Sequence, residues 1–267
     1  MLPSPIACII ASSSLLKGSS SLPSTVPISF TSSSLKVYTP ASISEKKAFG
    51  RVRLKAEEAG LEALGWSICA QDLLMVISKS VLGNANITLK MKYLFEDFST
   101  SKKALFLRPA NRPIEVLNDI DLVVGADGVN SSVRKKMGLI LNKKNFNQDA
   151  IVGHVFTSKS NNGIAIQKIF NLGSLALIPS GRNRFTFIFI VKKGCMKSYG
   201  RNYQAYLDLI NHLCGSDFGS YCFSDSPRIF PVYGSKVFYK HSDFFALVGN
   251  SRGTVHPSTA QGLNLGI

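Results

Sequence analysis

Residues 121–138, DLVVGADGVNSSVRKKMG, contain the pattern that decides the fold. The apolar run LVV predicts a buried strand, and the glycine-containing turn after it leads into a helix. Gly128 lets the backbone approach a ligand closely, and the carboxylate of Asp127 can accept hydrogen bonds from sugar hydroxyls. Ser131 is placed to cap the helix, and Arg134 follows about one turn later. The same order of strand, turn and capped helix occurs in α/β proteins of every kind.

Residues 245–267, FALVGNSRGTVHPSTAQGLNLGI, show a second arrangement of this type. A buried strand is expected to end at Gly249, and Pro257 and Gly262 shape the start of a following helix. Free backbone amides at a helix start bind anionic or electron-rich groups. We therefore expect this strand and the strand within residues 120–128 to end at one ligand crevice.

Taken together, the two segments resemble the flavin-dependent aromatic hydroxylase family. The first matches the family's D-G-x-x-S-x-x-R motif, which lies near the FAD pyrophosphate and the route of the nicotinamide cofactor. The second resembles the family's strand ending in G-D, followed by H-P and G-Q-G-x-N, and its wording is closest to the quinone-biosynthesis hydroxylases. The resemblance implies cofactor-binding roles for Asp127, Gly128, Ser131, Arg134, Gly249, Asn250, Pro257, Gly262, Leu263 and Asn264.

Two positions depart from the second motif. Asn250 stands where most members have Asp, and its carboxamide can still accept a hydrogen bond from a ribityl hydroxyl while adding a donor. Ala260 replaces the first glycine of G-Q-G and adds a Cβ atom where the backbone comes close to the flavin. His256 is interpreted as a histidine at a helix start, and no catalytic residue is assigned.

The order of patterns predicts an α/β fold in which an incomplete, Rossmann-like FAD-binding domain is interrupted by an antiparallel β-sheet. Helical periodicity is expected at 52–64, 72–82 and 201–213, and extended runs lie between 87 and 128. Four β-rich runs separated by Asn-Gly and Ser-Gly turns follow residue 144. The predicted domains are 45–145 and 236–267 for FAD binding and 146–235 for substrate binding.

The G-x-G-x-x-G string that seats the FAD pyrophosphate in this family is absent from the sequence. The sequence therefore resembles a partial member that lacks the first βαβ unit, and the loss of the pyrophosphate contacts would weaken FAD binding. A non-catalytic, degenerate flavoprotein-like polypeptide is accordingly one alternative. A flavin-dependent isoprenoid cyclase or reductase, which the wording GTVHPST favours, is another.

The first 44 residues have the composition of a targeting segment. They contain 14 serines and 3 threonines, and no carboxylate precedes Glu45. The apolar stretch IACII is too short for a secretory signal, and the lack of arginine favours a plastid transit peptide over a mitochondrial one. We expect residues 1–44 to be a disordered plastid transit peptide, with a mitochondrial leader as the alternative.

Composition excludes several other classes of protein. The formal net charge of +15 comes from lysines and arginines spread along the chain, without a nucleic-acid-binding motif, so no nucleic-acid partner is expected. Five cysteines and four histidines show no metal-ligand spacing, so no metal is expected. The longest apolar run, FTFIFIV, is far shorter than the roughly 18 residues of a spanning helix.

The resemblance implies an FAD-dependent monooxygenase that uses NAD(P)H and O₂ to hydroxylate or epoxidise an apolar or aromatic metabolite. In a plastid, quinones, isoprenoids and phenolic compounds are the expected small-molecule substrates. Peripheral contact with a membrane is a further expectation for such substrates. Within the enzyme, the cofactor supplies the redox chemistry, and the protein binds it and excludes water.

Overall fold

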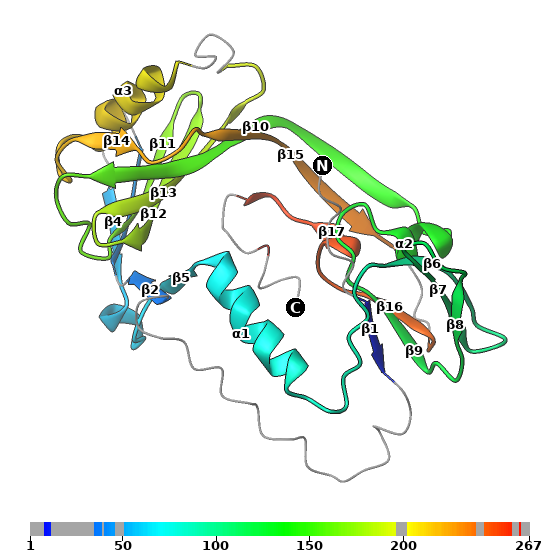
Figure 1. Cartoon of the computed structure of the whole chain (residues 1–267). Coiled ribbons are helices and arrows are strands. Elements are labelled where there is room, and N and C mark those ends of the chain that lie inside the picture. Colours follow the sequence, from blue (N-terminus) through cyan, green and yellow to red (C-terminus); the bar gives the residue numbers. More distant parts are fainter. Residues whose placement is uncertain are drawn as a thin grey trace. The chain divides into compact units, whose positions relative to one another are not determined.

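A computed structural model describes residues 8–11, 35–38, 40–45, 51–195, 202–238, 243–257 and 262 (Figure 1). The chain forms two compact units. Unit 1 combines residues 1–27, 85–146 and 233–267, and unit 2 combines residues 28–84 and 147–232. Residues 45–84 therefore lie in the same unit as the inserted sheet and not with 85–145. The FAD- and substrate-binding roles of the predicted domains stay predictions.

Unit 1 is built around a pair of parallel strands that come from distant parts of the sequence. Strand β9 (Leu122–Gly125) pairs with β16 (Phe245–Leu247), with Val123 opposite Phe245 and Gly125 opposite Leu247. Strand β1 (Cys8–Ala11) pairs with β9 in the antiparallel direction. Helix α2 (Ser132–Lys136) follows the β9 turn, as the sequence predicts. Side chains of β9, α2 and β16 share one core through Val123, Val133 and Leu247.

A three-stranded antiparallel sheet completes this core. Its strands are β6 (Tyr93–Ser99), β7 (Ala104–Pro109) and β8 (Glu115–Leu117), in that order. The extended run expected from residue 87 thus begins as a strand only at Tyr93. Strand β17 (Gly253–Thr254) pairs with the end of β15 (Arg228–Val237) in the same unit.

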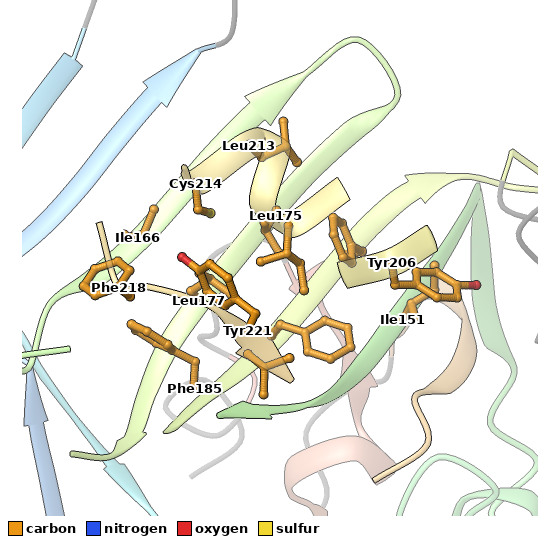
Figure 2. Close-up of a cluster of buried hydrophobic side chains, with 14 of the residues drawn as sticks. Ile151, Ile166, Leu175, Leu177, Phe185, Tyr206, Leu213, Cys214, Phe218 and Tyr221 are labelled. Carbon is orange, nitrogen blue, oxygen red and sulfur yellow. The ribbon is translucent and has the colours of Figure 1, made fainter. Parts of the chain in front are cut away.

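Unit 2 contains the predicted antiparallel sheet. Strands β10 (Leu141–Thr157), β13 (Arg184–Lys192), β12 (Gly173–Gly181) and β11 (Ala165–Phe170) are neighbours in that order, and β14 (Tyr221–Phe223) pairs with β10. The first six residues of β10, 141–146, belong to unit 1. Alternate residues of β13, namely Phe185, Phe187 and Phe189, are fully buried. They pack with residues of helix α3 (Tyr203–Cys214), including Tyr206, in the cluster shown in Figure 2. The period of two in the sequence therefore identifies the buried face correctly.

The predicted helix at 52–64 is wrong. Residues 51–55 form strand β4 (Arg51–Lys55), which pairs with β3 (Pro40–Glu45), and only a short 3₁₀ turn, η2 (Glu57–Ala59), follows. Gly60 ends that turn in the left-handed region at φ 65°. The alternation in RVRLK has a period of two, and strand pairing outweighed the helical spacing of the apolar residues.

The second predicted helix is confirmed as α1 (Ala70–Leu82). None of its residues is fully buried. Within residues 1–44, β1, β2 (Leu35–Tyr38) and most of β3 are strands, and the other residues of the predicted transit peptide lie outside the described residues. Strand β2 pairs with β5 (Gly65–Ile68). No helix in the described ranges is long and apolar enough to cross a membrane.

Candidate functional site

The two predicted ligand turns lie side by side in unit 1. Because β9 and β16 are parallel neighbours, the turn with Asp127 and Gly128 and the turn with Gly249 and Asn250 leave the same edge of the sheet. The backbone N–H of Val248 donates a hydrogen bond to the carbonyl oxygen of Gly125 at 3.0 Å, which joins the starts of the two turns. The labelled ribbons of β9 and β16 show this arrangement (Figure 1).

Arg134 and Ser251 fasten the turns to each other. Arg134 is 4% exposed, and its guanidinium donates to the carbonyl oxygens of Ser251 at 2.7 Å and Val129 at 2.8 Å. The Ser251 hydroxyl lies 2.6 Å from each of the carbonyl oxygens of Gly125 and Val248. Arg134 forms no ion pair with a carboxylate within the described residues. In this structure, therefore, the guanidinium holds the two turns in register through backbone carbonyls.

Asp127 has one oxygen engaged and one oxygen without a partner. Its Oδ2 accepts hydrogen bonds from the backbone N–H groups of Ser132 at 2.6 Å and Val133 at 3.3 Å. Ser131 caps the same helix through its hydroxyl, which accepts from the backbone N–H of Arg134 at 2.9 Å. The other Asp127 oxygen, Oδ1, is buried and has no hydrogen-bond partner. An unpaired buried acceptor costs about 1–3 kcal/mol, so a bound hydroxyl donor would be stabilising here.

Gly128 leaves space beside this acceptor. Its backbone adopts φ 80°, in the left-handed region, and a Cβ atom built at this position would meet no heavy atom within 4 Å. A turn with an open backbone and an unpaired carboxylate oxygen suits a ligand with hydroxyl groups.

A cavity of about 620 Å³ opens next to the second turn. Its volume lies within the usual range of small-molecule sites, roughly 300–1,000 Å³. Parts of β10, β15, η3 (Gly249–Ser251) and β17 line it. The lining residues are Asn142, Lys144, Phe146, Gly234, Ser235, Lys236, Phe238, Gly249, Asn250, Arg252, Gly253, Thr254, Val255 and Gly262.

The cavity brings together only some of the predicted site residues. Gly249, Asn250 and Gly262 line it, whereas Asp127, Gly128, Ser131 and Arg134 belong to the adjoining turn and helix. Pro257 is half-buried just beyond the cavity lining. Leu263 and Asn264 lie outside the described residues, as does Ala260.

Sequence reasoning missed Gly125 and Ser251. A Cβ atom on Gly125 would lie 2.7 Å from a Leu247 methyl group and 3.1 Å from Val133, so the glycine allows β9, α2 and β16 to pack closely. Ser251 is fully buried. The available signals were the small residue Gly125 at the end of the first strand and the small residue Ser251 in the turn that follows the second strand. Among the described residues, no group of His, Cys, Asp and Glu side chains could hold a metal ion.

Comparison with known proteins relates this site to flavoproteins. The chain is 27% identical to the ubiquinone hydroxylase UbiL of Rhodospirillum rubrum over 155 residues, which cover 55% of this chain and 34% of that protein. It is 26% identical to the mitochondrial ubiquinone biosynthesis monooxygenase COQ6 of Rattus norvegicus over 180 residues, covering 54% of this chain and 38% of that protein. The chain thus spans little more than a third of the length of these relatives. No protein-family model matches it.

Solved structures share the fold at low sequence identity. The flavin-dependent halogenase CmlS superposes with a TM-score of 0.66 at 16% identity, covering 87% of this chain and 44% of that one. The p-nitrophenol 4-monooxygenase PnpA of Pseudomonas putida superposes with a TM-score of 0.67 at 14% identity, covering 86% of this chain and 60% of that one. The protein therefore has an α/β flavoprotein fold. The predicted resemblance to the flavin-dependent aromatic hydroxylase family is confirmed, over part of the length of its members.

Proposed function

We propose that this chain carries the FAD- and substrate-facing part of an FAD-dependent monooxygenase, which uses NAD(P)H and O₂ to hydroxylate or epoxidise an apolar or aromatic metabolite. The observation that carries the proposal is the pair of turns at one sheet edge. In the first turn, the Oδ1 atom of Asp127 has no hydrogen-bond partner, and the neighbouring backbone at Gly128 is open. The relatives named as ubiquinone hydroxylases and monooxygenases support this reaction class over the stretch that they match.

Each predicted residue has a distinct role in this proposal. Asp127 Oδ1 accepts a hydrogen bond from a hydroxyl of the cofactor, and Gly128 provides backbone space for it. Asn250 contributes a carboxamide on the facing turn, and Ser131 and Arg134 are positioning residues. The remaining proposed cofactor contacts are Gly249, Pro257, Gly262, Leu263 and Asn264. Bound FAD would accept electrons from NAD(P)H and activate oxygen, while the protein orients it and excludes water.

Binding of FAD to the Asp127→Asn variant tests this assignment. The Asn carbonyl oxygen can still cap α2, while the amide group replaces the unpaired oxygen with a donor. We expect FAD affinity to fall by about tenfold, with unchanged stability, because one hydrogen bond from a cofactor hydroxyl is lost. Asp119→Asn is the matched control, because Asp119 is an exposed acid of the same unit. Equal FAD affinity of the two variants would contradict the role of Asp127.

A chain that folds but takes up no FAD would support the alternative function, a non-catalytic flavoprotein-like polypeptide. The absence of a G-x-G-x-x-G string favours that alternative. Flavin fluorescence, which changes when FAD is bound by protein, separates the two functions. NAD(P)H oxidation with added FAD then tests the electron donor.

We also propose import into a plastid, on the serine-rich composition of residues 1–44. Three relatives are named as mitochondrial proteins, which keeps the mitochondrion as the alternative destination. A fluorescent fusion of residues 1–50 distinguishes the compartments, and a cytosolic signal would exclude both. Peripheral membrane contact is proposed for access to apolar substrates, and co-sedimentation with anionic lipid vesicles tests it.

A further inference from the structure

Strand β3 lies inside the sheet of unit 2, although nearly all of it belongs to the serine-rich segment. It pairs with β11 in the parallel direction and with β4 in the antiparallel direction, where Ile43 lies opposite Val52. Among the described residues, β3 is the only strand neighbour of β4, which ends the sheet. Pro40 is the first residue of β3, and the start of a strand is one of the few places where a sheet tolerates proline. Loss of β3 would therefore leave β4 unpaired and open one edge of β11.

Strand β2 has the same role in a two-stranded sheet. It pairs with β5, with Val37 opposite Trp66, and the two strands lie side by side in Figure 1. In the part of the chain that the structure describes, β5 has no other strand partner, and both strands contact β12. An exposed strand edge is a template for pairing with another chain. A mature protein without β2 and β3 would expose three such edges, on β4, β5 and β11.

The composition of the serine-rich segment changes where β2 begins. Twelve of the 14 serines in residues 1–44 precede Leu35, and only Ser42 and Ser44 follow it. Residues 35–45, LKVYTPASISE, end with the first carboxylate of the chain, that of Glu45. Targeting segments are rich in serine and poor in acids, whereas strands favour β-branched and aromatic residues. Strand pairing and composition therefore agree that the folded protein begins at Leu35.

We propose that the targeting segment ends before Leu35, so that processing on import leaves β2 and β3 on the mature protein. The inference rests on the proposed import into an organelle, and it shortens the segment of 44 residues that composition alone predicts. A processing peptidase of the organelle hydrolyses one peptide bond. One water molecule gives the released leader a carboxylate and the mature chain an α-amino group.

A cut before Leu35 is compatible with the rest of the fold. Strand β1 leaves with the leader, and β9 keeps its parallel neighbour β16. A cut after residue 44 is different, because β4 and β5 would then keep no strand neighbour within the described ranges. The structure thus sets a limit on the position of the cut.

Import of the full chain into isolated chloroplasts, followed by N-terminal sequencing of the processed product, tests the position of the cut. We expect a product whose first residue lies at or before Leu35. A product that begins after Leu35 would overturn the proposal. The same assay with isolated mitochondria covers the alternative destination. A chain that neither organelle imports would contradict the proposed import, and the cut with it.

Hydrogen exchange of the full chain tests, without import, whether β3 is part of the fold. Because β4 pairs only with β3 among the described strands, protection of the β4 amides reports this pairing. Ile43→Pro removes an N–H group from a strand that has a neighbour on each side, so the β4 amides should lose protection by about tenfold or more. Ile43→Val is the matched control, because it changes the same side chain and keeps the N–H group. Ile10→Pro, in β1, should leave the β4 amides protected.

Two results of this measurement would also overturn the proposal. One is exchange of the β4 amides in the unsubstituted chain that is as fast as in Ile43→Pro. The other is an equal loss of protection in Ile43→Val or Ile10→Pro. Failure of import by itself leaves the protection of β4 unchanged, so the two measurements distinguish a wrong destination from a wrong boundary.

Discussion

Arg134 offers the most direct test of how the two turns are held together. Replacing it with Met removes two hydrogen bonds from a buried cation, to the carbonyl oxygens of Ser251 and Val129. Charge-assisted bonds contribute about 1.5–3 kcal/mol each, so the free energy of unfolding of unit 1 should fall by about 3–6 kcal/mol. Arg134→Lys keeps the charge but cannot reach both carbonyls with one fork, so an intermediate loss is expected.

Urea unfolding followed by circular dichroism measures this loss. Lys135→Met is the control, because Lys135 is the exposed neighbour on the same helix. Hydrogen exchange gives a local readout at the amide of Val248, which donates to Gly125 and should lose protection in Arg134→Met. If the stability and the Val248 exchange of Arg134→Met match those of the Lys135→Met control, Arg134 does not hold the two turns together.

Three further measurements probe other parts of the chain. Gly125→Ala should destabilise unit 1 by about 1–3 kcal/mol, since its Cβ would overlap Leu247 and Val133; an unfolding midpoint equal to that of the unsubstituted chain would contradict the close approach. Two hydrogen bonds to its carboxylate lower the pKa of Asp97. The larger effect comes from the Lys136 side chain and the smaller from the backbone N–H of Phe98. A carboxyl whose pKa is lower in the folded state than in the unfolded state stabilises the fold at pH values above its unfolded pKa. This stabilisation is lost as the pH falls through the folded pKa. In urea titrations, Asp97→Asn should therefore lower the free energy of unfolding by less than about 1 kcal/mol at pH 7 and leave it unchanged at pH 2. Burial raises the pKa of Cys214 to about 12, so a thiol reagent at pH 8 should label the exposed Cys69 and Cys222 quickly and Cys214 only after unfolding; rapid labelling of Cys214 in the folded chain would disagree.

The sheet of unit 2 could be predicted because its information is local. In residues 184–192, RFTFIFIVK, burial changes with nearly every residue, and the pleat of a strand converts that alternation into an inner and an outer face. The strand and helix around Asp127 were predictable for the same reason, from an apolar run, a glycine turn and a serine cap. Residues 52–64 were not, because apolar spacing over a short window fits both a helix and a strand, and pairing with β3 decided between them.

Sequence by itself determined which two turns carry ligand-binding residue types, and in what order they occur along the chain. Only the tertiary structure decided that Arg134 donates a hydrogen bond to the carbonyl oxygen of Ser251, a residue 117 positions away. It also decided that one Asp127 oxygen accepts hydrogen bonds from the start of helix α2. It alone placed Lys144 beside Lys236 at one cavity, since strand neighbours are chosen by pairing across the sheet and leave no trace in residue spacing. Local patterns report what a segment can bind, whereas long-range contacts select which of those groups are left free to do so.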